Sequence, residues 1–114
     1  MKVLVCGDRN WIDRAKIEAR LRQLPPDTVI LEGECRGADL LAKDVAGKLG
    51  FDVVGFPADW EKHGRAAGPI RNRKMLDGRP DLVLAFHSDL SKSKGTADAV
   101  REAKRRGIPV EVVA

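Results

Sequence analysis

Hydrophobic residues occur in five short runs along the chain. In the stretches between these runs, apolar residues are spaced apart by polar ones. The runs are KVLVC (residues 2–6), TVILE (28–32), FDVVGF (51–56), DLVLAF (81–86) and PVEVV (109–113). Three of them are nearly continuous in apolar residues, which is typical of strands covered on both faces of a sheet. We therefore expect five β-strands.

The stretches between these runs have the spacing of amphipathic helices. Within residues 37–49, apolar side chains recur every three or four positions, and Gly50 stands where a helix would end. Residues 13–23 and 96–106 follow the same scheme, with the stripes Ile17, Leu21, Leu24 and Ala97, Val100, Ala103. Residues 66–77 complete a set of four expected helices.

This alternation of strands and helices predicts an α/β protein. Right-handed crossovers between parallel strands give a Rossmann-like three-layer sandwich, with helices on both faces of a five-stranded parallel sheet. The usual strand order for five strands is 3-2-1-4-5, which creates a topological switch point between strands 1 and 4, where ligands bind. At 114 residues we expect a single domain spanning residues 1–114.

The composition indicates which kinds of ligand the protein favours and where in the cell we expect it. The net charge of +4 favours anionic ligands but does not require a nucleic-acid groove. No apolar run approaches the roughly 18 residues of a membrane span, and the run at residues 2–6 is too short for a signal peptide. Cys6 and Cys35 lack neighbours at metal-ligand spacing, so we expect a reducing cytoplasm, no metal and no cofactor.

Polar residues of functional types collect in the loops that follow the first four strands. These residues are Gly7, Asp8 and Arg9 after the first strand, Gly33, Arg36, Gly37 and Asp39 after the second, Asp59 and Trp60 after the third, and Gly95 and Thr96 after the fourth. Because the carboxyl ends of parallel strands share one edge of the sheet, we expect these loops to form one site.

Each of these residues also has a purely structural interpretation. Gly33 and Gly37 can serve tight turns, although a glycine pair flanking Arg36 before a helix also lets backbone N–H groups approach an anion. Aspartates in such loops are commonly helix caps. Trp11 and Trp60 fit either a core position or stacking on a base. His63 and His87 have no evident partner in the sequence, and we assign neither a catalytic role.

The segment AAGPIRNRKM (66–75) places basic residues beside a Gly-Pro turn. Arg71 stands at the start of the expected helix, where its guanidinium can make bidentate contacts to phosphate or carboxylate, and Asn72 offers both a donor and an acceptor. Arg73 and Lys74 fit a solvated helix face. The dinucleotide, triphosphate, zinc-protease and hydrolase signatures are all absent from the sequence.

Several of these motifs occur together in a known family. The series GDRNW, EGECRGAD, PADW, AAGPIRNRKM, KGTADAV and GIPV resembles the YspA-like branch of the SLOG superfamily, found in bacteria and their phages. The match covers essentially the whole chain and is most specific in PADW and AAGPIRN. The resemblance implies a Rossmann-like fold, a homodimer, and a nucleotide or nucleotide-derived ligand. It also implies that the matching glycines, among them Gly68, contribute to the site together with Arg71, Asn72, Gly95 and Thr96.

More distant members of the superfamily suggest an alternative activity. Lonely-guy phosphoribohydrolases cleave the N-glycosidic bond of nucleoside 5′-monophosphates, and this sequence is similar to their site at Arg73-Lys74-Met75 and Gly95-Thr96. The family's glutamate is replaced by Ala99, which leaves Asp98, Glu102, Asp39 and Glu34 as candidate catalytic carboxylates.

The sequence therefore supports three hypotheses for the function of the protein. The first is a nucleotide-binding protein acting in nucleotide signalling or phage–host conflict, and the second is the N-glycosidase. The third, which ranks last, is a single-stranded DNA-binding module like the Rossmann-like domain of the DNA-processing protein DprA, because the basic residues are spread along the chain with few aromatics among them.

Overall fold

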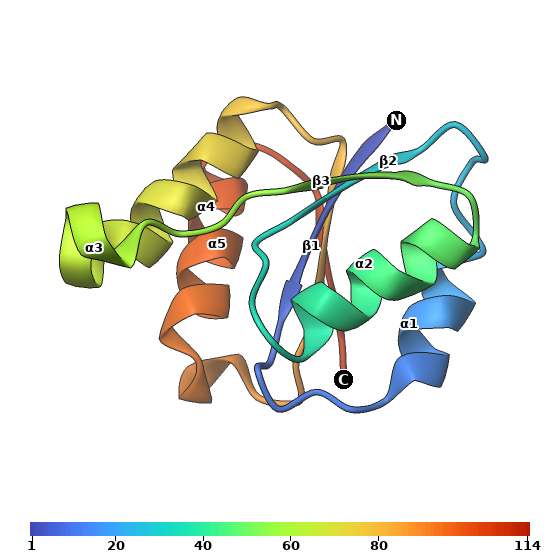
Figure 1. Ribbon diagram of the computed structural model, residues 1–114, viewed down its shortest axis with the longest axis horizontal. Helices are drawn as coiled ribbons and strands as arrows, with labels where there is room; N and C mark the ends of the chain where they lie inside the picture. The colour runs from blue at the N-terminus through green and yellow to red at the C-terminus, as the bar shows by residue number, and fades with distance from the viewer.

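The computed structural model describes residues 1–114 and places five parallel strands in one twisted sheet (Figure 1). The strands are β1 (Lys2–Gly7), β2 (Val29–Glu32), β3 (Asp52–Gly55), β4 (Leu82–Phe86) and β5 (Val110–Val113). Their order is β3-β2-β1-β4-β5, which confirms the predicted order. Because all strands run the same way, the amino and carboxyl termini lie at opposite ends of the sheet (Figure 1).

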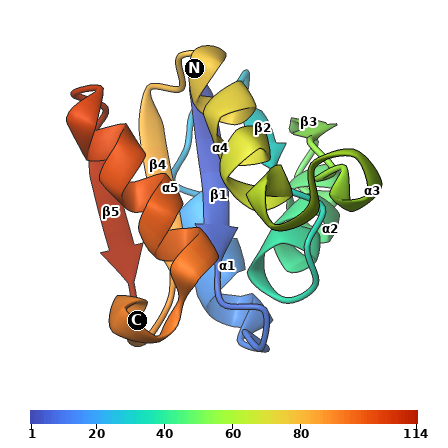
Figure 2. The ribbon, with the colours of Figure 1, turned by 90° about the vertical axis from the view of Figure 1, so that its left-hand side faces the viewer.

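Four main helices cover the sheet, as the sequence predicts. They are α1 (Arg14–Leu21), α2 (Ala38–Lys48), α4 (Ala67–Asp77) and α5 (Lys94–Arg105). In Figure 2, α4 and α5 lie in front of the sheet, and α1 and α2 lie behind it. Three short elements were not predicted: α3 (Trp60–His63), η1 (Gly64–Ala66) and η2 (Leu90–Lys92). None of the helices is long and apolar enough to cross a membrane.

The core consists of two apolar layers, one on each face of the sheet. In β1, Val3 and Val5 pack against the layer of α1 and α2, while Leu4 and Cys6 belong to the layer of α4 and α5. The same alternation holds in β4. The continuous apolar runs of the sequence are therefore strands buried on both faces, and their side chains supply both layers.

Three details of the predicted helices differ from the structure. Helix α5 begins two residues earlier than expected, because the side chain of Ser93 caps it by accepting a hydrogen bond from the N–H of Thr96 at 3.2 Å. Its buried face contains Ala99 rather than Ala97, which is half-buried. In addition, Leu24 is buried but lies beyond the end of α1.

The sheet order creates a crevice beside the two central strands. The chain leaves β1 toward α1 on one face of the sheet and leaves β4 toward α5 on the other face. Loops that separate in this way leave open space at the carboxyl ends of the strands. The candidate site lies at this point.

Candidate functional site

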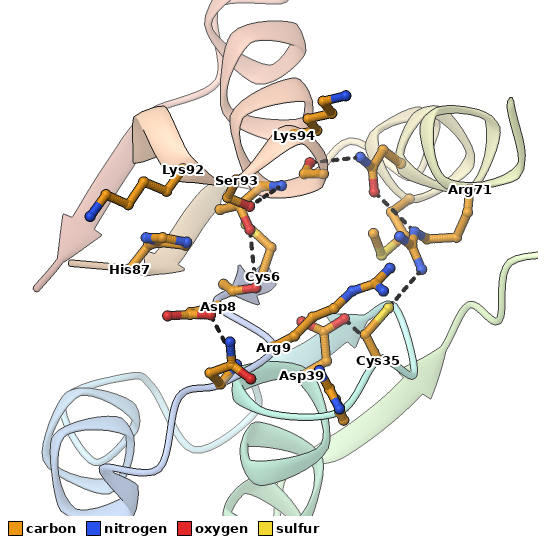
Figure 3. Close-up of a pocket in the computed structure, with 17 residues that line it drawn as sticks. Cys6, Asp8, Arg9, Cys35, Asp39, Arg71, His87, Lys92, Ser93 and Lys94 are labelled. Atoms are coloured by element: carbon orange, nitrogen blue, oxygen red, sulfur yellow. Dashed lines mark hydrogen bonds between the residues drawn. The ribbon is translucent and has the colours of Figure 1, made fainter. Parts of the chain in front are cut away.

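A cavity of about 330 Å³ opens at the carboxyl ends of β1 and β4 (Figure 3). Nine of the residues predicted for the site line it: Gly7, Asp8, Arg9, Arg36, Asp39, Arg71, Asn72, Gly95 and Thr96. They come from the end of β1 and the loop after it, the loop before α2 and the first turn of that helix, helix α4, and the start of α5. Residues that are far apart in the sequence thus meet in one pocket.

The wall between β1 and α2 depends on a close approach of two loops. Gly37, the residue before α2, has a φ of 78°, and a Cβ at this position would overlap the carbonyl oxygen of Asp8. The same carbonyl oxygen accepts a hydrogen bond from the N–H of Ala38 at 3.1 Å. Only glycine fits this position without strain, so Gly37 serves the turn that brings Arg9 and Arg36 together.

Two charged residues of the pocket bind the backbone of Gly33, one at its N–H and the other at its carbonyl oxygen. Asp39 Oδ2 accepts hydrogen bonds from the N–H groups of Gly33 at 3.1 Å and Cys35 at 3.4 Å. Arg71 Nη1 donates to the carbonyl oxygen of Gly33 at 2.7 Å and lies 3.5 Å from the Sγ of Cys35. Gly33 therefore does not line the cavity itself but holds both charged side chains in its wall.

The carboxyl group of Asp39 has an unusual environment. It is 6% exposed, and burial raises its pKa to about 6, although the N–H groups of Cys35 and Gly33 and the charge of Arg71 act in the opposite direction. Its second oxygen, Oδ1, accepts no hydrogen bond from the protein. The pocket thus contains a carboxyl group that changes its protonation near neutral pH and has an oxygen available to a ligand.

Asn72 and Thr96 connect the helices around the cavity. Asn72 Oδ1 accepts from Arg71 Nε at 2.9 Å, and its Nδ2 donates to the carbonyl oxygen of Gly95 at 3.2 Å. Thr96 Oγ1 donates to the carbonyl oxygen of Gly7 at 3.0 Å. These bonds fix the start of α5 against both α4 and β1, so the positive end of this helix is oriented by its neighbours.

The strongest property of the pocket is its unpaired positive charge. Five cationic side chains line the cavity, together with two carboxylates: Arg9, Arg36, Arg71, Lys92 and Lys94 with Asp8 and Asp39. None of the five cations makes an ion pair within 4.0 Å. The contrast is clearest among the arginines, since the three in the pocket are unpaired and seven of the nine outside it are paired. Uncompensated cations that converge on one cavity favour an anionic ligand.

His87 is a pocket residue that the sequence reasoning missed. It follows β4 directly and is 6% exposed, and its Nδ1 accepts a hydrogen bond from the N–H of Asp89 at 3.0 Å. The neutral ring therefore carries its proton on Nε2, which has no partner in the protein and can donate to a ligand. His87 and Lys92 lie across the pocket from Arg9 and Arg71 (Figure 3). Its position at the end of a central strand was the available signal.

The loop after β3 does not reach the cavity, so Asp59 and Trp60 lie outside it. Gly68, in the first turn of α4, does not line it either. Asp59 caps α3 by accepting from the N–H of Lys62 at 3.0 Å. Trp60 is 51% exposed, and its ring lies over the buried Gly68. The reason is the strand order: β3 is an edge strand, two places from β1. The sequence pattern correctly predicts that this loop lies at the carboxyl edge of the sheet. It contains no information on how far the loop lies from the switch point.

Three of the candidate catalytic carboxylates also lie outside the cavity. Asp98 accepts from Asn72 Nδ2 at 3.1 Å and pairs with Arg73 at 3.5 Å. Glu102 is held by Arg105 and Arg106, whose hydrogen bonds lower its pKa to about 2. Glu34 pairs with Lys43 at 2.8 Å. Of the four carboxylates considered, only Asp39 faces the pocket.

The fold and the pocket define an α/β protein with a cationic site at its topological switch point. A model of the YspA, cpYpsA-related SLOG family (YAcAr) matches residues 1–63. The Gene 61 protein of Mycobacterium phage D29 is 39% identical over 118 residues, covering 96% of this chain and 93% of the phage protein. The chain therefore belongs to the YspA and cpYpsA-related SLOG family.

The fold also has a solved counterpart. DNA processing protein A (DprA) from Streptococcus pneumoniae aligns with a TM-score of 0.62 at 16% sequence identity. The alignment covers 96% of this chain and 58% of the DprA chain, so this chain spans little more than half of that protein. At this level of identity the similarity establishes the shared Rossmann-like fold.

Proposed function

We propose that the protein binds a nucleotide or a nucleotide-derived ligand in the cavity between β1 and β4. The observation that carries this proposal is the set of cations lining the cavity without ion-pair partners. The beginnings of α2 and α5 add positively polarised N–H groups, which suit phosphate oxygens. His87 adds a further donor. Membership of the SLOG family supports the same ligand class.

The division of roles among the arginines determines how this proposal is tested. Arg71 is buried and bonded to Gly33, so its replacement would disturb the wall of the pocket as well as any ligand contact. Arg9 and Arg36 are exposed side chains that line the cavity without ion pairs. Replacing either of these should therefore report on ligand binding without unfolding the loop.

The experiment is a thermal-shift and calorimetric screen of nucleoside 5′-monophosphates against wild type, Arg9→Ala and Arg36→Ala. Arg65→Ala is the matched control, because Arg65 is exposed, makes no ion pair and lies outside the cavity. Each pocket variant should weaken binding about tenfold or more, the scale of one lost charge-assisted hydrogen bond. If no nucleotide binds wild type, or if the pocket variants bind as well as Arg65→Ala, the proposal fails.

The environment of Asp39 supports N-glycoside hydrolysis as a second candidate function. A carboxyl group with a pKa of about 6 and a free oxygen in a ligand pocket is suited to proton transfer. In this reaction the C1′–N bond breaks, and water supplies a hydroxyl group to C1′ and a proton to the departing base. Asp98 and Glu102, which do not line the cavity, have no part in this scheme.

Asp39→Asn separates the two functions. The asparagine Oδ1 still accepts from the N–H groups of Gly33 and Cys35, and the substitution removes a negative charge from the pocket. For a binding protein we expect equal or tighter nucleotide binding and no free base from wild type. For a hydrolase, chromatography should detect free base from wild type and its loss in Asp39→Asn, with nucleotide binding retained.

We also propose a homodimer, and nucleotide signalling or phage–host conflict as the biological setting. The family membership supports both, and the relative from phage D29 supports a phage context. Sedimentation velocity at several protein concentrations tests the first point, since a sedimentation coefficient of a 12.5 kDa monomer at all concentrations would exclude a stable dimer.

A further inference from the structure

A second hollow lies beside the cavity at the carboxyl ends of β1 and β4, which we call the cationic pocket, and shares part of its wall. Its volume is about 750 Å³, and it lies between the loop after β1 and helix α2. Three residues line both spaces: Arg9, Asn10 and Arg36. The two hollows are therefore adjacent compartments that meet at the same pair of arginines.

The second compartment differs from the first in chemistry. Its apolar lining consists of Trp11, Ile12, Leu40 and Leu41, and we call this surface the apolar shelf. Ile12 is 90% exposed and Leu40 is 41% exposed, which makes them conspicuous on the surface of this small protein. Neither packs against the core, whereas Trp11 and Leu41 do. The core therefore gives no reason for Ile12 and Leu40 to be apolar.

The net positive charge around the apolar shelf is concentrated on the side next to the cationic pocket. At the far side of the shelf, Arg14 and Asp44 form an ion pair of 2.5 Å and neutralise each other. On the near side, Arg9 and Arg36 have no ion-pair partners. A ligand that spans both compartments would thus meet positive charge at one end and an apolar, electrically balanced surface at the other.

We propose that the apolar shelf receives the base of a nucleotide whose phosphate occupies the cationic pocket. This assignment rests on the proposed nucleotide-binding function and adds Ile12 and Leu40 as residues that select a ligand carrying a base. A base is flat and largely apolar on its faces, so it can pack on leucine and isoleucine side chains. The guanidinium groups of Arg9 and Arg36, at the boundary, suit both ring stacking and phosphate contacts.

The decisive comparison is between ligands with and without a base. Isothermal titration calorimetry measures the affinities of AMP, GMP, CMP, UMP and ribose 5-phosphate for wild type and for Ile12→Ala/Leu40→Ala. Wild type should prefer at least one nucleotide over ribose 5-phosphate by about tenfold, the scale of burying one apolar group. The double variant should lose this preference while its affinity for ribose 5-phosphate changes less than about twofold.

Val112→Ala is the matched control, because Val112 is 44% exposed and lines neither compartment. Its preference for nucleotide over ribose 5-phosphate should equal that of wild type. Ile12 and Leu40 are both exposed, so we expect the double variant to melt within about 3 °C of wild type. Thermal melts establish that the variants are folded before affinities are compared.

A spectroscopic measurement tests the same placement independently. The chain has two tryptophans, so Trp60→Phe leaves Trp11 as the single emitter. Because Trp11 lines the shelf and Trp60 lies outside both compartments, a base on the shelf should change the fluorescence of Trp11. Ribose 5-phosphate should leave that fluorescence unchanged.

The outcomes separate this inference from the proposed function. If ribose 5-phosphate binds in an Arg9-dependent way and nucleotides bind no more tightly, the shelf assignment is wrong while the phosphate site in the cationic pocket stands. The same holds if the double variant still prefers nucleotides over ribose 5-phosphate. If no phosphorylated compound binds, the proposed function fails, and this inference fails with it. If the double variant keeps the preference but turns a dimer into a monomer in sedimentation velocity, the shelf is a subunit interface and the inference is overturned.

Discussion

Asp39 and Arg71 carry opposite charges in the wall of the same pocket, yet they bind the N–H and the carbonyl oxygen of one residue, Gly33, rather than each other. Asp39 accepts from the N–H of Gly33 at 3.1 Å, and Arg71 donates to the carbonyl oxygen of Gly33 at 2.7 Å. No ion pair of 4.0 Å or less joins the two residues. The loop after β2 is therefore held from both sides, and the charge of Arg71 is not neutralised by direct contact.

Arg71→Ala should destabilise the protein by about 1.5–3 kcal/mol, the cost of losing hydrogen bonds to a buried charged group. The substitution leaves the carbonyl oxygen of Gly33 without this donor and removes the charge that favours ionised Asp39. Urea denaturation measures the free energy of unfolding. Arg65→Ala, at an exposed position without ion pairs, should change it by less than about 0.5 kcal/mol. Equal stability of both variants would contradict a structural role for Arg71.

Gly37→Ala and Gly47→Ala should change stability in opposite directions. At Gly37 the φ of 78° and the overlap with the carbonyl oxygen of Asp8 should cost about 1–3 kcal/mol. Gly47 lies inside α2 with no atom within 4 Å of an added Cβ, so alanine there should stabilise by about 0.5–1 kcal/mol. Thermal and urea denaturation of the two variants test this. A stable Gly37→Ala variant would show that the turn before α2 tolerates a side chain.

The stability of the protein should fall as the pH rises from about 5 to 7. Glu32 is fully buried at the end of β2, and burial raises its pKa from an ordinary value of 4.5 to about 7. The folded chain thus holds a proton that the unfolded chain has released, so this stabilisation is present below the ordinary pKa and is lost as the pH rises through 7. Asp39, with a pKa of about 6, acts in the same direction.

Glu32→Gln should reduce this dependence on pH, because glutamine does not ionise. The carboxyl group accepts from the N–H of Glu34 through Oε2, which the amide oxygen can replace, while Oε1 has no partner. Urea denaturation at several values between pH 5 and 8 measures the slope. Glu61→Gln is the control, since Glu61 is exposed and makes no ion pair. A slope in Glu32→Gln equal to that of wild type would exclude Glu32 as its source.

Single-stranded DNA should bind little better than a mononucleotide. Five unpaired cations converge on one cavity rather than line a groove that could follow a strand. In fluorescence anisotropy with oligothymidylate, the slope of log affinity against log salt should be no steeper than about −2, which corresponds to about three phosphates. A steeper slope, combined with an affinity far above that for TMP, would favour the DNA-binding hypothesis instead.

The fold could be predicted from the sequence because the strands supply apolar side chains to both layers of the core. The run from Leu82 to Phe86 is apolar throughout, and such a run fits a parallel strand buried on both faces. Caps such as Asp13 and Ser93 then set the helix starts to within about two residues. The strand order followed from the usual connectivity of five-stranded folds rather than from any particular residue.

The site was predicted less completely, because a cavity depends on distances and side-chain directions that a linear pattern does not contain. Arg36 and Thr96 could be assigned to the correct edge from their positions after central strands. Trp60 was assigned by the same rule, but its strand is at the edge of the sheet. Asp98 and Glu102 lie on α5 beyond its first turn, where helix rotation turns them toward arginines. His87 was missed because its partner is a backbone N–H group, which no sequence pattern shows.

The parallel course of the strands has a practical consequence for attaching anything to this protein. The chain starts at one end of the sheet and finishes at the other (Figures 1 and 2). The C-terminus follows the carboxyl end of β5, and the cavity also lies at the carboxyl edge of the sheet. There, Lys16 Nζ donates to the oxygen of Ala114 at 2.6 Å. An affinity tag or reporter fused at Met1 should leave ligand entry open, whereas the same fusion at Ala114 would crowd it.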